Sequence, residues 1–159
     1  MTPAWSAVIA TPLPTGWRFG IRCGGSRVCA TDFLPSGTPL QAAVGECARH
    51  AVADVERYFS ACHSLFTVEL GPYGTPFQQR VWRALCAIPP GRPCSYGELA
   101  QALGSSARAV AAACRANPIP LLIPCHRVVA AHGPGGYMGA TDGEPLQLKI
   151  WLLHHEAAG

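Results

Sequence analysis

Residues 95 to 118 constrain the fold more than any other stretch of the chain. The segment SYGELAQALG begins with a capping box, because Ser95 is followed three residues later by Glu98, and Gly104 is typical of a helix end. One of the two serines that follow can cap a second helix, SARAVAAACRAN. This helix must stop before Asn117-Pro118, since a residue preceding proline disfavours the α region. Two short helices joined at Gly104 predict a helix-turn-helix.

Turn residues divide the chain ahead of this motif. The run Gly71-Pro72-Tyr73-Gly74 predicts a boundary near residue 72, so we expect one domain over 1–72 and a second over 73–159. Thr75-Pro76 starts an amphipathic helix that Pro89-Pro90-Gly91 ends. The apolar sequence KIWLLHHE predicts a last helix near the C-terminus.

The first 72 residues have a different pattern. Three β-rich stretches near 6–10, 17–23 and 27–33 are separated by proline and glycine, which predicts an antiparallel meander. Apolar positions then recur at three and four residues over 42–59, which predicts a helix. The expected fold class is therefore α/β: a small N-terminal lobe, with an antiparallel sheet and a helix and a structural role, packed on a helical C-terminal lobe.

Composition excludes several classes of protein. The 159 residues are 49% apolar with a net charge of +3, unlike a disordered chain. The longest uncharged apolar run, 117–126, is interrupted by prolines and falls short of the roughly 20 residues that span a bilayer. The N-terminus lacks the features of a secretory signal, and the eight cysteines form no CxxC pair. We therefore expect a cytoplasmic monomer with reduced cysteines and no membrane partner.

Charge is concentrated in the second half. Residues 77–127 contain six arginines against Glu98 alone, so this region can either bind a polyanion or present a solvated basic face. The second helix of the pair is rich in alanine, with Arg108 and Arg115 projecting from it. Alanines suit a tightly packed core helix, but they also allow close approach to DNA, where an arginine can reach the base stack.

The strongest chemical signal is the segment IPCHRVV at 123–129. Cys125 is followed by His126 and Arg127, so a proton acceptor and positive charge are expected near the thiol, conditions that favour a reactive thiolate. If the segment is extended, His126 points away from Cys125, and a water molecule or a turn must connect them. Glu156 is a candidate to hold the histidine tautomer. Cys62-His63 lacks this context and is expected to be structural.

Taken together, IPCHRVV, the preceding NPIP, SYGELA and ARAV closely resemble the O6-alkylguanine-DNA alkyltransferases, also called methylated-DNA-protein-cysteine methyltransferases. The resemblance runs from about Gly74 to Glu156, whereas the N-terminal lobe matches only in length and pattern. It implies a DNA repair protein that flips O6-alkylguanine out of double-stranded DNA and transfers the alkyl group irreversibly to Cys125. It further implies that each molecule reacts once and needs no cofactor.

The resemblance also implies roles for individual residues. Cys125 is the expected acceptor, His126 the base acting through water, and Glu156 the acid that orients it. Asn117 would brace the active-site loop, and Tyr96 would help to rotate the nucleotide and protonate the leaving guanine. The other expected contacts are with DNA (Arg108, Ala107, Ala109, Arg115) and with the base pocket (Val128, Tyr137, Met138, Lys149).

Three features depart from the family pattern. Met138 replaces a usually smaller residue after the tyrosine, and residues 141–148 form a longer segment than is typical. Some relatives bind zinc in the N-terminal lobe. The side chains that could bind zinc here lack a recognisable spacing, so no metal is expected. They are Cys23, Cys29, Cys47, His50, Cys62 and His63.

Two alternative functions remain open from the sequence. The same fold could sense alkylated bases without transferring the alkyl group, although relatives of that kind lack the acceptor cysteine. A cysteine hydrolase that uses Cys125, His126 and Glu156 is the other alternative, and the adjacency of Cys125 and His126 argues against it.

Overall fold

The structure is a computed structural model that describes residues 4–158. Its elements divide into two units. The first contains the chain through Tyr73 together with Pro118–Pro120, and the second contains residues 74–117 and the chain from Leu121 onward.

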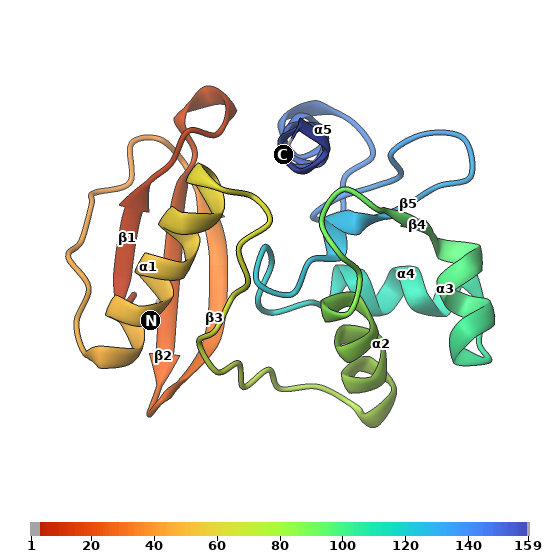
Figure 1. The fold of residues 1–159 in the computed structure, drawn as a ribbon, viewed down its shortest axis with the longest axis horizontal. Helices are drawn as coiled ribbons and strands as arrows, with labels where there is room; N and C mark the ends of the chain where they lie inside the picture. The colour runs from red at the N-terminus through yellow and green to blue at the C-terminus, as the bar shows by residue number, and fades with distance from the viewer. Residues whose placement is uncertain (1–3, 159) are drawn as a thin grey trace. The chain divides into compact units, whose positions relative to one another are not determined.

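The first unit contains a three-stranded antiparallel sheet in the order β1-β2-β3, formed by Ala7–Ala10, Arg18–Gly24 and Arg27–Leu34 (Figure 1). A short 3₁₀ turn, η1 (Pro14–Gly16), precedes β2. The β2–β3 pairing shifts register between Arg22 and Cys23. The predicted meander is confirmed, because alternating apolar residues along these strands, such as Phe19 and Ile21, are fully buried.

Helix α1 (Glu46–Ser60) lies across one face of this sheet (Figure 1). Its buried positions Ala48, Ala51, Val55 and Tyr58 follow the predicted helical period. The helix begins four residues later than the apolar pattern predicted. Gly45 has a φ of 93°, a conformation that breaks the helix, and Val44 before it is 68% exposed.

Asp54 on α1 anchors the irregular segment that ends the first unit. Its buried carboxylate accepts hydrogen bonds from the backbone amides of Thr67 and Val68, at 2.7 and 2.9 Å. These bonds, together with one from Arg57, hold the pKa of Asp54 below its ordinary value despite burial, which alone would raise it. The anchored segment continues into a bridge between Leu70 and Val28 of β3.

The second unit begins with helix α2 (Pro76–Cys86), whose start is fixed by a capping box between Thr75 and Gln78. Trp82 is buried on this helix, and its indole nitrogen donates to the carbonyl oxygen of Ala113 at 2.9 Å. Gly74 packs so closely on Trp82 that a Cβ atom there would lie 2.4 Å from the indole ring. The glycine is therefore required by close approach to the tryptophan.

Helices α3 (Tyr96–Leu103) and α4 (Ala107–Arg115) pack on each other as the predicted helix-turn-helix. Ser95 and Glu98 form the predicted capping box, and Gly104 ends α3 with a left-handed φ of 64°. Ser106 caps α4 by accepting a hydrogen bond from the amide of Ala109. Local cap chemistry thus accounts for both ends of the turn.

Two short strands, β4 (Cys94–Ser95) and β5 (Val128–Val129), pair in parallel. They bring the start of α3 beside the segment that follows the 3₁₀ turn η2 (Cys125–Arg127), which we call the CHR turn. Helix α5 (Gly143–Ala158) is longer than predicted and includes most of residues 141–148, the segment that we expected to be longer than is typical. Pro145 lies in its first turn, where proline is compatible with a helix. Within residues 4–158, no helix is long and apolar enough to cross a membrane.

Candidate active site

Cys125, His126 and Arg127 form a single 3₁₀ turn, η2, between Pro124 and β5. The amide of Arg127 donates to the carbonyl oxygen of Pro124 at 3.0 Å, which closes the turn. The segment is therefore not extended. We had expected either a water molecule or a turn to connect Cys125 with His126, and the structure contains a turn. All three residues of η2 are nevertheless buried. Burial of a thiol, an imidazole and a guanidinium in consecutive positions demands specific partners for each.

The partner of Cys125 is Asn117, which follows α4. Asn117 Nδ2 donates to the Cys125 sulfur at 3.3 Å and to the carbonyl oxygen of Ile123 at 2.8 Å. One amide group thus fixes both the thiol and the chain two residues before it. Burial raises the pKa of Cys125, while the Asn117 hydrogen bond and the charge of Lys149 lower it.

His126 is paired with Glu156 on α5. The His126 Nε2 and the Glu156 Oε2 are 2.6 Å apart, and both side chains are almost completely buried. A carboxylate can only accept a hydrogen bond, so the proton of a neutral His126 lies on Nε2 and Nδ1 keeps its lone pair. Nδ1 has no hydrogen-bond partner within residues 4–158. Burial, with help from the charges of Arg127 and Lys149, lowers the pKa of His126 below its ordinary value although Glu156 acts to raise it, which favours the neutral base.

Arg127 does not supply the positive charge that the sequence led us to expect beside the thiol. Its guanidinium points to Glu156, with Nε 2.9 Å from Oε1 and Nη2 3.2 Å from Oε2. The cation that acts on Cys125 is instead Lys149, from α5. The expectation failed because adjacent residues in a turn project in different directions.

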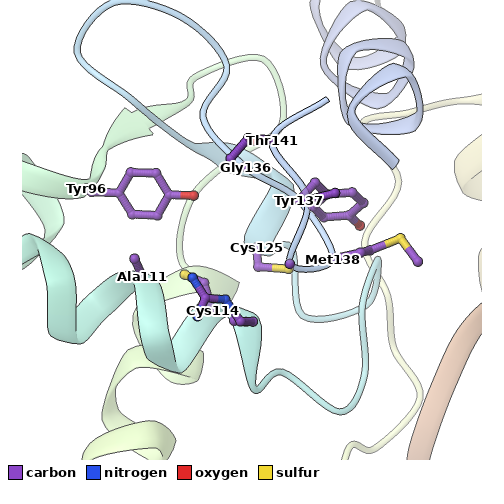
Figure 2. A pocket seen from close by; sticks show the side chains of 11 residues that line it. Tyr96, Ala111, Cys114, Cys125, Gly136, Tyr137, Met138 and Thr141 are labelled. Atoms are coloured by element: carbon purple, nitrogen blue, oxygen red, sulfur yellow. The ribbon is translucent and has the colours of Figure 1, made fainter. Parts of the chain in front are cut away.

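A cavity of about 180 Å³ opens beside the Cys125 side chain. Figure 2 shows Cys125, Cys114 of α4 and the Tyr96 hydroxyl from α3 around it. Burial raises the pKa of Tyr96 to about 12, so its hydroxyl keeps its proton and can donate a hydrogen bond. The full lining comes from the helix-turn-helix, η2 and the loop before α5 (Tyr96, Ala111, Cys114, Arg115, Cys125, and residues 136–141).

The loop side of the cavity ends in a tight two-residue turn. Tyr137 and Ala140 exchange two backbone hydrogen bonds at 2.8 and 2.9 Å, while Met138 and Gly139 have positive φ values of 53° and 77°. These angles match the type I′ hairpin turn, which favours asparagine or glycine at the position that Met138 occupies. Tyr137 is buried, and Met138 is 41% exposed at the cavity (Figure 2).

Two residues expected at the base pocket, Val128 and Lys149, are not among those that line this cavity. Val128 lies in β5, and Lys149 is buried behind the wall. The Lys149 Nζ donates to the carbonyl oxygens of Val128 and Gly136 at 2.7 and 2.9 Å. It also lies 5.7 Å from the Tyr96 ring centroid. Burial lowers the pKa of Lys149 to about 8. Lys149 therefore ties the pocket wall to β5.

The residues expected to contact DNA lie along α4. Arg108, Ala107 and Arg115 are exposed, and Ala109 is partly exposed. Arg115 also lines the cavity, as do its neighbour Cys114 and, one turn earlier on the same helix, Ala111. No role had been expected for Ala111 or Cys114 from the sequence. Helical spacing could have placed Cys114 near the site, because it lies three residues before Asn117.

The N-terminal unit has a second, open pocket that includes Cys47 and His50. Thr67 Oγ1 lies 2.6 Å from the His50 Nε2. Among the described residues, no group of three or more histidine, cysteine or acidic side chains is arranged to hold a metal ion. Within residues 4–158, none of the eight cysteines forms a disulfide bond.

Fold and site define a class of protein in which a buried thiol, supported by a histidine–carboxylate pair, opens on a cavity formed partly by a helix-turn-helix. The family model "6-O-methylguanine DNA methyltransferase, DNA binding domain" matches residues 76–158. The chain belongs to this family.

Similar proteins agree with this assignment. A probable methylated-DNA--protein-cysteine methyltransferase of Acanthamoeba polyphaga mimivirus is 40% identical over 111 residues, covering 68% of this chain and 71% of that protein. The Salmonella typhimurium methylated-DNA--protein-cysteine methyltransferase is 50% identical over 93 residues, 57% of this chain, and the match spans about half of that protein (52%). The structure of the Mycobacterium tuberculosis protein OGT in complex with DNA superposes with a TM-score of 0.78 at 35% identity, covering 95% of this chain and 91% of that one.

Proposed function

We propose that this chain repairs DNA by transferring the alkyl group of O6-alkylguanine in a duplex to its own Cys125. The observation that carries the proposal is the position of the Cys125 thiol, which faces a cavity lined partly by α3 and α4. The Salmonella relative is named a methylated-DNA--protein-cysteine methyltransferase, and the M. tuberculosis relative was solved with DNA. Both names support the same reaction and the same partner for this chain.

The proposed chemistry is a single displacement. The Cys125 proton passes through a water molecule to Nδ1 of His126, whose Nε2 is held by Glu156. The thiolate then attacks the alkyl carbon, a carbon–sulfur bond forms, and the bond from that carbon to O6 breaks. The electron pair of the broken bond stays with guanine. Tyr96 donates a proton to guanine as it leaves, and that proton is replaced from His126 through solvent.

The product explains why one molecule is expected to react once. Alkyl transfer leaves a thioether on Cys125, and a thioether has no carbonyl carbon that water can attack. The thiolate itself is the reagent, so the step that we propose uses no metal or organic cofactor. Because O6 lies in a stacked base, the nucleotide must leave the helix before the thiolate can reach its alkyl group.

We assign the remaining residues by their positions. Arg108 at the start of α4 fills the space of the flipped base, and Ala107 and Ala109 allow α4 to approach DNA closely. Arg115, at the cavity and exposed, contacts the DNA backbone. Tyr137 and Met138 cover the extruded base, while Lys149 and Val128 support the pocket wall from behind. Asn117 positions Cys125 and favours its thiolate.

The N-terminal unit, residues 1–72 in our assignment, serves as a structural lobe, and residues 73–159 bind DNA and accept the alkyl group. The reaction requires a reduced thiol with access to DNA. We therefore propose a cytoplasmic location, with which eight cysteines that form no disulfide bond among the described residues agree. We propose that the protein acts as a monomer.

The two alternative functions have less support. A sensor of alkylated bases needs no acceptor, whereas here Asn117 and Lys149 both act to favour the Cys125 thiolate. A cysteine hydrolase needs a histidine in contact with the thiol, but the His126 Nδ1 has no partner within the described chain.

Replacing the acceptor tests the proposal. Cys125→Ser should abolish methyl transfer from a duplex that contains one O6-methylguanine, yet retain binding to that duplex. Cys86→Ser, at an exposed cysteine on α2, is the matched control and should transfer normally. Transfer that persists in Cys125→Ser would overturn the assignment of the acceptor.

A further inference from the structure

Arg127 is buried and fully engaged, although the reaction proposed above gives it no role. Its side chain is only 7% exposed. Its Nη1 donates to the carbonyl oxygen of Ile88, just beyond α2, at 2.7 Å, while Nε and Nη2 donate to the two carboxylate oxygens of Glu156. The guanidinium thus connects the CHR turn to the end of α2 and to α5.

Arg127 and His126 share one carboxylate. Glu156 Oε2 accepts from the His126 Nε2 at 2.6 Å and from the Arg127 Nη2 at 3.2 Å, and Oε1 accepts from the Arg127 Nε. A buried carboxylate without a compensating cation attracts a proton strongly, either to itself or to a histidine that touches it. With Arg127 paired to it, Glu156 orients the imidazole without having to draw a second proton onto the ring.

Two other titratable groups lie near His126. Lys149 from α5 is a cation that disfavours a further positive charge on the ring. Cys125, on the same turn, carries no charge while it holds its proton. On the α2 side, Cys86 interacts with Arg127. Glu156 therefore supplies one negative charge near two cations, Arg127 and Lys149. A protonated His126 would add a third positive charge inside the protein.

We propose that Arg127 is a positioning residue for alkyl transfer: by sharing the Glu156 carboxylate, it keeps His126 neutral, with Nδ1 free to accept the Cys125 proton. This inference rests on the proposed function for its consequence, but the state of His126 can be measured without any substrate. Arg127 therefore acts on the proton acceptor His126, and not on the Cys125 thiol or on DNA.

The inference predicts how the transfer rate depends on pH. Transfer needs neutral His126, so the rate falls as the pH drops through the pKa of His126, which lies below its ordinary 6.5. In Arg127→Met the uncompensated carboxylate raises that pKa, so the acid limb of the profile moves up by about one to three pH units. Arg127→Lys keeps the charge and should retain the wild-type acid limb even where its rate is lower.

Single-turnover transfer from a duplex with one O6-methylguanine, measured from pH 5 to 9, tests this expectation. Arg49→Met removes an exposed arginine of α1 and is the control, with an unchanged profile. A folded Arg127→Met protein with the wild-type acid limb would overturn the inference. So would a shift in Arg127→Lys equal to that in Arg127→Met.

A measurement on the wild-type protein tests the inference even if the Arg127 variants do not fold. Ring ¹⁵N shifts of labelled histidine, assigned by loss of the His126 signal in His126→Gln, should show a proton on Nε2 and none on Nδ1 at pH 7. A doubly protonated His126 would overturn the inference. If the wild-type protein carries neutral His126 but transfers no methyl group, the proposed function fails while the protonation state that the inference predicts is confirmed.

Discussion

Replacing Asn117 with alanine removes the donor that the Cys125 sulfur accepts from, at 3.3 Å. The bond favours the thiolate over the thiol because an anion is the stronger acceptor, so its loss raises the pKa of Cys125 above its already raised value. A hydrogen bond to a charged group contributes about 1.5–3 kcal/mol, and each pKa unit corresponds to about 1.4 kcal/mol. The pKa should therefore rise by about one to two units.

At pH 7, below both pKa values, the thiolate fraction and hence the transfer rate should fall by about 10- to 100-fold. The assay is single-turnover methyl transfer from the O6-methylguanine duplex as a function of pH. The two profiles should run parallel near neutrality and converge only above the wild-type pKa of Cys125. Asn117→Asp keeps the shape of the side chain but offers a negative charge in place of the donor, and it should be slower still.

The same substitution leaves the Ile123 carbonyl oxygen without its side-chain donor. We expect a loss of about 1–3 kcal/mol in the free energy of unfolding, or a melting temperature lower by about 2–12 °C. A thermal melt therefore checks that the variant is folded at the assay temperature. A folded Asn117→Ala protein that loses less than about threefold in rate at pH 7 would refute the reasoning.

Three further changes test other parts of the site. Met138→Gly should be more stable than Met138→Ala by about 1 kcal/mol in chemical denaturation, because only glycine adopts the φ of 53° without penalty; equal stabilities would contradict the strained turn. Glu156→Gln places an amide against the buried His126 and Arg127, so we expect unfolding to become easier by about 3–5 kcal/mol and transfer to slow by up to about 10⁴-fold as the tautomer changes. A rate within tenfold of wild type would count against the tautomer argument. Arg108→Ala should slow repair in a duplex more than attack on free O6-methylguanine, and equal losses on the two substrates would exclude a role in base extrusion.

Local sequence signals predicted much of the fold because they act over a few residues. Thr75-Pro76 and the capping box at Ser95 predicted the starts of α2 and α3, and Gly104 predicted the turn between α3 and α4. The start of α1 was placed too early because apolar period alone cannot show that Gly45 adopts a positive φ. Helix α5 begins at Gly143, before the apolar sequence from which it was predicted.

The site was predictable in its residue types and less so in its contacts. His126 and Glu156 are 30 positions apart, yet the sequence predicted this pair. A catalytic histidine needs a carboxylate partner, and Glu156 in the apolar C-terminal helix was the candidate. Nothing local showed that Arg127 turns toward the same carboxylate, because the direction of a side chain in a 3₁₀ turn depends on tertiary packing. The place of Lys149 behind the wall also depends on two distant carbonyl oxygens.

The acceptor role of Cys125 is tested most directly by intact mass and peptide mapping after incubation with a duplex that contains one O6-methylguanine. The account predicts one added methyl group per molecule, located on Cys125, with no further increase when the duplex is in excess. A protein that binds the duplex and remains unmodified, or that carries the methyl group on another residue, would contradict it.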